Sequence, residues 1–124
     1  MILNKKSNGF SLIELLISLV ILAISLLALA SLMAMTTQNN SFGSHMTEAT
    51  TLAQDQLENL RVTPWANVVT GADPLPIAGS TGIPYTRSWT VAQNADGTLR
   101  AVTITITWTD RTGHSIRLLS AIPQ

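Results

Sequence analysis

The 124-residue sequence predicts an α+β protein, in which one long N-terminal helix packs on a small three-stranded antiparallel sheet. Three observations support this fold class: an apolar run over residues 10–35, a helical stripe of apolar residues over 36–61, and an alternating apolar and polar pattern near the C-terminus. A chain of this length has room for one small domain besides a membrane segment.

The apolar run from Phe10 to Met35 predicts a transmembrane helix. Of its 26 residues 21 are apolar, and the exceptions are four serines and Glu14. As a helix the run would reach roughly 39 Å, which exceeds the bilayer hydrocarbon core of about 30 Å. Lys5 and Lys6 precede the run and the next positive charge is Arg61, so the positive-inside rule predicts a cytoplasmic N-terminus.

Residues 36–61 predict an amphipathic continuation of the same helix. Apolar side chains recur there at steps of three and four residues, at Phe42, Met46, Ala49, Ala53, Leu57 and Leu60. We expect a bend or a frayed turn near Asn39–Gly43, and a helix end before Pro64. Residues 62–85 contain four of the five prolines and are predicted to form a loop.

Residues 86–124 predict an antiparallel β meander. Its clearest strand is 99–110, where Val102, Ile104, Ile106 and Trp108 alternate with threonines. A preceding strand is expected over 85–93 and a following one over 115–122, with turns at 94–97 and 110–113. Three strands cannot bury an apolar face alone, so we expect the sheet to pack on the amphipathic half of the helix.

The N-terminal residues resemble a known family. A short basic leader ends in Gly9, Phe10 follows it, and Glu14 then stands at the fifth position of the shortened chain, within the long apolar run. This pattern resembles the prepilin signature of type IV pilins and of the pseudopilins of type II secretion. The resemblance implies a leader over residues 1–9, in which Lys5 and Lys6 serve either topology or recognition by the peptidase. It also implies cleavage between Gly9 and Phe10 by prepilin peptidase, and N-methylation of Phe10.

Within this family the chain is most similar to PilV-type minor pilins, through residues 49–61 and a later Trp108, Asp110 and Gly113. Major pilins of the family generally have a proline in the apolar half of the helix, and many close a C-terminal loop with a disulfide. This chain has no proline there and no cysteine, so the resemblance implies a minor and not a major pilin. The resemblance implies an inner-membrane protein with a periplasmic C-terminal domain that helps to prime or modify pilus assembly. Its implied partners are prepilin peptidase, other minor and major pilins, and inner-membrane lipid.

Three other functions stay open from the sequence. A minor pseudopilin of a type II secretion system would carry the same N-terminal signature. A secreted binding domain would arise from signal-peptidase cleavage after Ala30, which stands in a small-x-small sequence. The third possibility is a single-pass anchor with an extracellular binding domain. In that case the spacing of Gly9, Phe10 and Glu14 would have arisen by chance.

Glu14 is the charge that needs a physical explanation. A charged side chain at the centre of a membrane helix costs around 2.5–3.5 kcal/mol, so such a residue usually has a partner. After cleavage, the new ammonium group of Phe10 on a neighbouring subunit could be that partner, and the pair would then set the register of assembly. The alternative is an interfacial acid that the helix macrodipole favours.

The sequence indicates a structural and interaction protein and not an enzyme. It has no cysteine, no nucleophile motif and no glycine run for phosphate, so we expect no catalytic residue and no cofactor. His45 and His114 lack ligand spacing, and we expect both to be solvent-exposed and no metal site to form. Five arginines and six acids follow the apolar run, so no nucleic-acid partner is expected.

Overall fold

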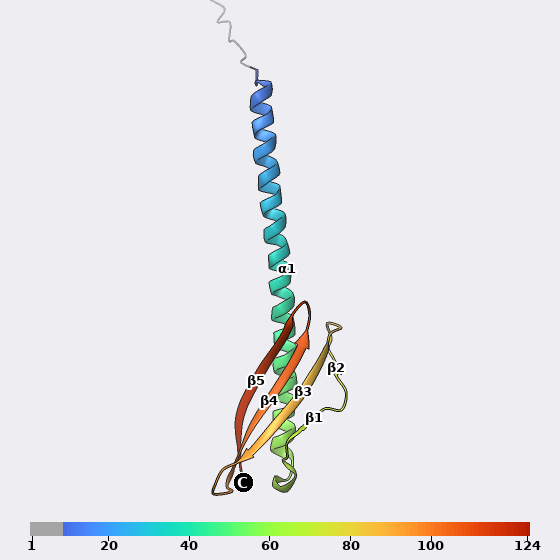
Figure 1. Ribbon diagram of the computed structural model, residues 1–124, viewed down its shortest axis with the longest axis vertical. Helices are drawn as coiled ribbons and strands as arrows, with labels where there is room; N and C mark the ends of the chain where they lie inside the picture. Colours follow the sequence, from blue (N-terminus) through green and yellow to red (C-terminus); the bar gives the residue numbers. More distant parts are fainter. Residues whose placement is uncertain (1–8) are drawn as a thin grey trace, which may run out of the picture. The chain divides into compact units, whose positions relative to one another are not determined.

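The computed structural model describes residues 9–124, which divide into two compact units with a boundary after Asn40 (Figure 1). Helix α1 (Leu12–Val62) supplies the regular structure of the first unit up to that boundary. The remaining residues of α1, 41–62, form the helical layer of the second unit, which also holds the sheet. Helical hydrogen bonding continues through Asn39–Gly43, so the frayed turn expected there is absent.

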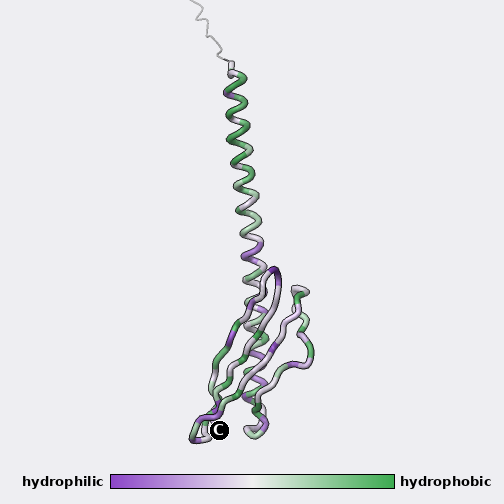
Figure 2. Tube along the Cα trace, viewed as in Figure 1, coloured by the Kyte–Doolittle hydropathy of each residue, from purple (hydrophilic) through white to green (hydrophobic). Residues whose placement is uncertain are grey.

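The first unit exposes an apolar helix surface. Every large hydrophobic side chain from Phe10 to Met35 is more than half exposed, and Figure 2 shows the corresponding part of α1 as mostly hydrophobic. The segment is long and apolar enough to cross a membrane, and none of it is buried within the protein. Such a surface is stable in lipid or against other apolar helices, because water would leave all of it unfavourably hydrated.

The second unit contains a five-stranded antiparallel sheet, so the prediction of three strands is wrong. The three expected strands are present as β3 (Pro84–Gln93), β4 (Leu99–Thr109) and β5 (Gly113–Pro123). Two further strands, β1 (Gly71–Ala72) and β2 (Ile77–Ala78), both pair with β3. They lie inside the segment predicted to be a loop, which also holds a short 3₁₀ helix, η1 (Trp65–Asn67). Two-residue strands carry no alternating pattern, so they form only because β3 offers them a pairing edge.

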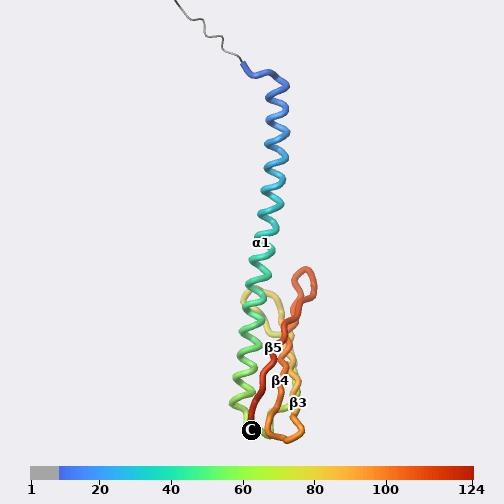
Figure 3. The backbone as a smooth tube through the Cα atoms, turned by 90° about the vertical axis from the view of Figure 1, so that its left-hand side faces the viewer, coloured from blue at the N-terminus to red at the C-terminus, as the bar shows by residue number. Residues whose placement is uncertain are grey.

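The core of the second unit lies between α1 and one face of the sheet (Figure 3). The alternation predicted along β4 is confirmed: Val102, Ile104, Ile106 and Trp108 are buried, and the threonines between them face the other way. From α1 the buried apolar residues are Ala49, Ala53, Leu57 and Leu60. The N-terminal part of the predicted helical stripe is not buried in the same way, because Phe42 and Met46 stay more than one-third exposed.

Candidate functional site

The candidate processing site lies at the start of α1. Gly9 and Phe10 are outside the helix, and the Phe10 side chain is 87% exposed. Ser11 then caps the helix: its hydroxyl oxygen accepts a hydrogen bond from the Glu14 N–H at 3.4 Å, and its carbonyl accepts one from the Leu15 N–H at 3.1 Å. The Gly9–Phe10 peptide bond is therefore followed at once by a capped helix.

The capping role of Ser11 was not predicted from the sequence. Ser11 and Glu14 have the serine-x-x-glutamate spacing of a capping box, and this spacing was readable from the sequence. Lys5 and Lys6, the residues predicted to set leader topology, lie outside the described residues.

Glu14 lies in the first turn of α1 and is exposed, at the end of the helix where the macrodipole favours an acid. Within residues 9–124 its carboxylate forms no ion pair and accepts no hydrogen bond. By contrast, the hydroxyl groups of nearby serines have hydrogen-bond partners within the helix. Those of Ser18 and Ser25 each donate to the carbonyl four residues earlier at 2.8 Å. Glu14 is thus the one charged side chain of the apolar segment, and its carboxylate is unpaired within residues 9–124.

The N-terminal segment matches a known sequence motif. Residues 4–30 match the prokaryotic N-terminal methylation motif. The match contains Gly9, Phe10 and Glu14, and it supports a type IV pilin-like or pseudopilin protein. The motif implies processing by prepilin peptidase and assembly with other pilins, and with the exposed apolar helix it fits a single-pass anchor of the inner membrane. No curated protein and no solved structure matches the chain.

A second polar cluster lies in the second unit, around Glu48 of α1. One carboxylate oxygen accepts a hydrogen bond from the Ser80 N–H, and the other accepts bonds from the Tyr85 hydroxyl at 2.9 Å and the Thr81 hydroxyl at 3.1 Å. The backbone hydrogen bond from Ser80 is the main cause that lowers the pKa of Glu48 to about 2. The carboxylate therefore fastens the turn before β3 to α1.

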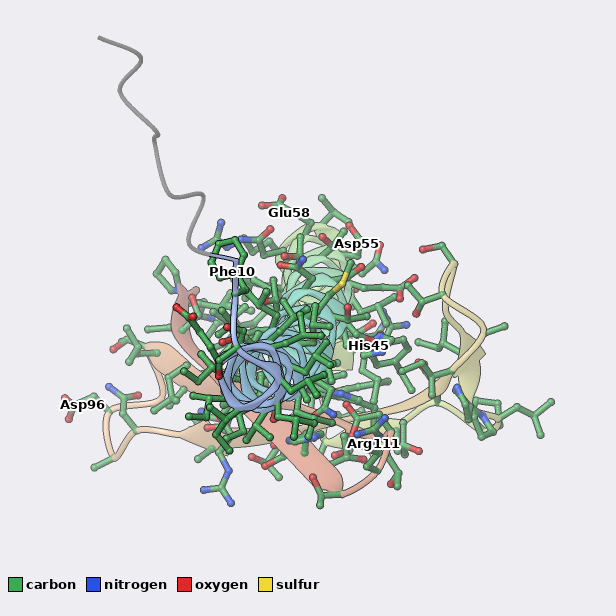
Figure 4. The ribbon with its side chains drawn as sticks, turned by 90° about the horizontal axis from the view of Figure 1, so that it is seen from above. Phe10, His45, Asp55, Glu58, Asp96 and Arg111 are labelled. Atoms are coloured by element: carbon green, nitrogen blue, oxygen red, sulfur yellow. The ribbon has the colours of Figure 1, made fainter. Side chains whose placement is uncertain are left out.

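His45 extends this cluster and is buried, so its predicted exposure is wrong. Its Nε2 lies 3.1 Å from the Ser41 hydroxyl, and its Nδ1 lies 3.1 Å from the Thr81 hydroxyl and 3.3 Å from that of Tyr85. Figure 4 shows His45 pointing from α1 toward the segment that carries β2. Thr81 and Tyr85 lie 36 and 40 residues along the chain from His45, which is why sequence spacing did not indicate them.

His114 is half-buried at the start of β5, so it is less exposed than predicted. Its Nε2 lies 3.0 Å from the Asp110 carboxylate, and its ring centroid lies 5.0 Å from that of Phe42. Within residues 9–124 the structure holds no cluster of three or more side chains that could bind a metal ion. The contacts of both histidines lie within the second unit.

Stability of the second unit is expected to depend on the ionised form of Glu48. Because the pKa of Glu48 is lowered from 4.5 to about 2, its stabilising effect is present above pH 4.5 and is lost as pH falls toward 2. Glu48→Gln should therefore lower Tm at pH 7, and the difference from wild type should shrink below pH 4.5. Near-UV circular dichroism of the full chain in detergent micelles follows the transition.

The matched control is Asp55→Asn, an exposed acid of the same helix that Figure 4 shows on the side of α1 away from the sheet. It should leave Tm nearly unchanged across this range. The pKa of Asp110 is also lowered to about 2, by the N–H groups of Arg111 and Thr112. That effect is common to the wild type and both variants, so it cancels in the comparison of their Tm values. A Tm difference for Glu48→Gln that stays constant from pH 7 to 3 would contradict the prediction.

Proposed function

We propose that the chain is a minor type IV pilin that helps to prime or modify pilus assembly after prepilin peptidase removes residues 1–9. The observation that carries this proposal is the spacing of Gly9, Phe10 and Glu14 inside the matched methylation motif, at the start of an exposed apolar helix. The C-terminal domain would lie in the periplasm, because the positive charges of Lys5 and Lys6 favour a cytoplasmic leader.

The geometry at the start of α1 suits such processing. Gly9 has no side chain and nothing within 4 Å of where a Cβ would stand, so a protease can approach the bond that follows it. Cleavage would leave an ammonium group on Phe10, one helical turn before Glu14. In lipid, apolar helices that pack side by side exclude water, and a carboxylate there is favourable only against a cation of good geometry. The Phe10 ammonium of a neighbouring subunit supplies such a cation.

A minor role is favoured over that of a major fibre subunit by two features of the sequence. No proline interrupts residues 10–35, and no cysteine can close a C-terminal loop. A minor pseudopilin of a type II secretion system is the second candidate, because the methylation motif serves that class equally well. The polar clusters around Glu48 and His114 are occupied by hydrogen bonds within the domain, which supports a structural role without catalysis.

Processing can be measured directly on the membrane-extracted protein. We expect co-expression with a prepilin peptidase to remove residues 1–9 and to add one methyl group to Phe10, as seen by intact mass and N-terminal sequencing. Gly9→Val should block cleavage because its branched side chain crowds the scissile bond. Gly43→Ala is the matched control, since a Cβ at Gly43 also meets open space and lies far from the site in sequence.

Two results would contradict the proposed function. A chain that begins at Met1 with and without the peptidase would be a plain membrane anchor. A soluble form that begins at Ser31 would be a secreted domain cut after Ala30. Appearance of the processed chain in sheared surface fibres would favour the pilin over the pseudopilin.

A further inference from the structure

The sheet of the second unit has one long edge without a pairing partner. β5 is the last strand in the order β1-β3-β4-β5, and it pairs with β4 over all 11 of its residues, from Gly113↔Thr109 to Pro123↔Leu99. The register runs through every pair without a bulge. Figure 1 shows no helix or strand alongside the other edge of β5 among the residues described. Alternate N–H and C=O groups of β5 therefore point to a side where the domain offers them no strand.

The opposite edge of the same sheet is covered. β1 and β2 pair with β3 there, and Arg87 of β3 holds the covering segment through Asp73, with nitrogen–oxygen distances of 2.8 and 3.2 Å. The indole N–H of Trp89 donates to the Val69 carbonyl at 2.9 Å, which fastens the start of the segment. The domain thus closes one edge with paired backbone and an ion pair, and it leaves the β5 edge open.

β5 also lacks the features that usually protect a free edge from pairing. Such edges carry several charges, prolines or bulges, but the only charge of β5 beside its terminal histidine is Arg117, and its proline is the last residue, Pro123. On the face toward α1, Ile116 and Leu118 are only half-buried, although they pack against the core. An added strand with apolar residues on that face would complete their burial.

We propose that the free edge of β5 accepts an extended segment of a different chain as a sixth strand, with an acidic residue beside Arg117. Arg117 is exposed and forms no ion pair within residues 9–124, so an incoming carboxylate would find it free. This inference goes beyond the proposed function and does not depend on processing of the leader.

The position of Arg117 disfavours a second copy of this chain as the partner. Antiparallel pairing of two β5 strands near their centres places the two Arg117 side chains either opposite or diagonal to each other on one face. Like charges at such positions are destabilising, whereas an acid in a partner strand is favourable. The charge therefore selects a different, acidic strand.

A peptide probe tests the proposal on the full-length chain in phosphatidylcholine nanodiscs. The probe is an acetylated peptide with the β4 sequence Leu99–Thr109 that carries Thr105→Glu, because Thr105 is the β4 residue opposite Arg117. Fluorescence polarisation should show saturable binding, with empty nanodiscs as the baseline. The same peptide with Thr105→Lys should bind about fivefold more weakly, and the protein variant Arg117→Glu should reverse this preference.

Backbone pairing is tested by N-methylation of alternate peptide residues. In an antiparallel ladder, the N–H groups of every second residue point to the same neighbouring strand. Two peptides are therefore compared, one methylated at the odd-numbered residues and the other at the even-numbered residues. One of them should lose binding and the other should retain it. No saturable binding, an equal effect of both sets, or no response to Arg117→Glu would overturn the proposal. The chain has no native cysteine, so a disulfide-linked dimer formed by Ser115→Cys would assign the edge to a second copy and would also overturn it.

Discussion

Glu14→Val is expected to leave the chain in the membrane and to reduce its incorporation into pili by about 100-fold or more. Removing one partner of a buried ion pair costs about 3–5 kcal/mol, because the other charge stays buried and uncompensated. Each 1.4 kcal/mol corresponds to a factor of ten in a binding equilibrium. In the assembled fibre the uncompensated charge would be the Phe10 ammonium of a neighbour. Membrane insertion should persist, since valine makes the segment more apolar.

The measurement compares the chain in sheared fibres with the chain in membranes, using cells that express prepilin peptidase and the other pilins. Glu14→Gln keeps the size of the side chain without its charge and should fail like Glu14→Val and Glu14→Ala. Glu58→Gln is the matched control, because Glu58 is an exposed acid of α1 whose ion pair with Arg61 lies at the surface. Normal incorporation of Glu14→Val would refute the role of Glu14 in register.

Ile106→Ala is expected to lower the free energy of unfolding of the second unit by about 2–5 kcal/mol. Ile106 is 0% exposed, and it lies on the buried face of the central strand β4, between Arg87 of β3 and Ile116 of β5. Truncation leaves a cavity that neighbours paired on both sides cannot close by moving. For a unit of this size Tm should fall by about 10 °C or more.

Thr107→Ala is the control for this substitution, because Thr107 is the next residue of the same strand and points to the exposed face of the sheet. Its effect should stay within about 0.5 kcal/mol. Both variants are measured by thermal unfolding of the full chain in detergent micelles. Equal effects of the two substitutions would show that the face assigned as buried does not carry the core.

The parts of the fold that follow from local periodicity were predictable from the sequence. Alternation with a period of two placed Val102, Ile104 and Ile106 on the buried face of β4, and this is confirmed. Steps of three and four placed Ala49 and Ala53 on the buried face of α1, which is also confirmed. In both cases the side-chain direction is set by the backbone geometry of a single element, so nearby residues carry the whole signal.

The polar cluster of the second unit was not predictable in this way. Glu48 meets Ser80 across 32 residues of sequence, and His45 meets Tyr85 across 40. A lone acid and a lone histidine on a helix look like solvent-exposed residues until a distant turn is folded against them. The number of strands was missed for a related reason, since β1 and β2 exist through their pairing with β3.

The sequence by itself determined the apolar segment that is long enough to cross a membrane, and the methylation motif with Gly9, Phe10 and Glu14, because both depend on consecutive residues read in order. Only the tertiary structure decided that Glu48 and His45 fasten a turn to α1, and that the sheet covers its β3 edge while its β5 edge stays open. The physical reason is that hydrogen bonds and strand pairing join groups by distance in space, and the folded chain alone sets those distances.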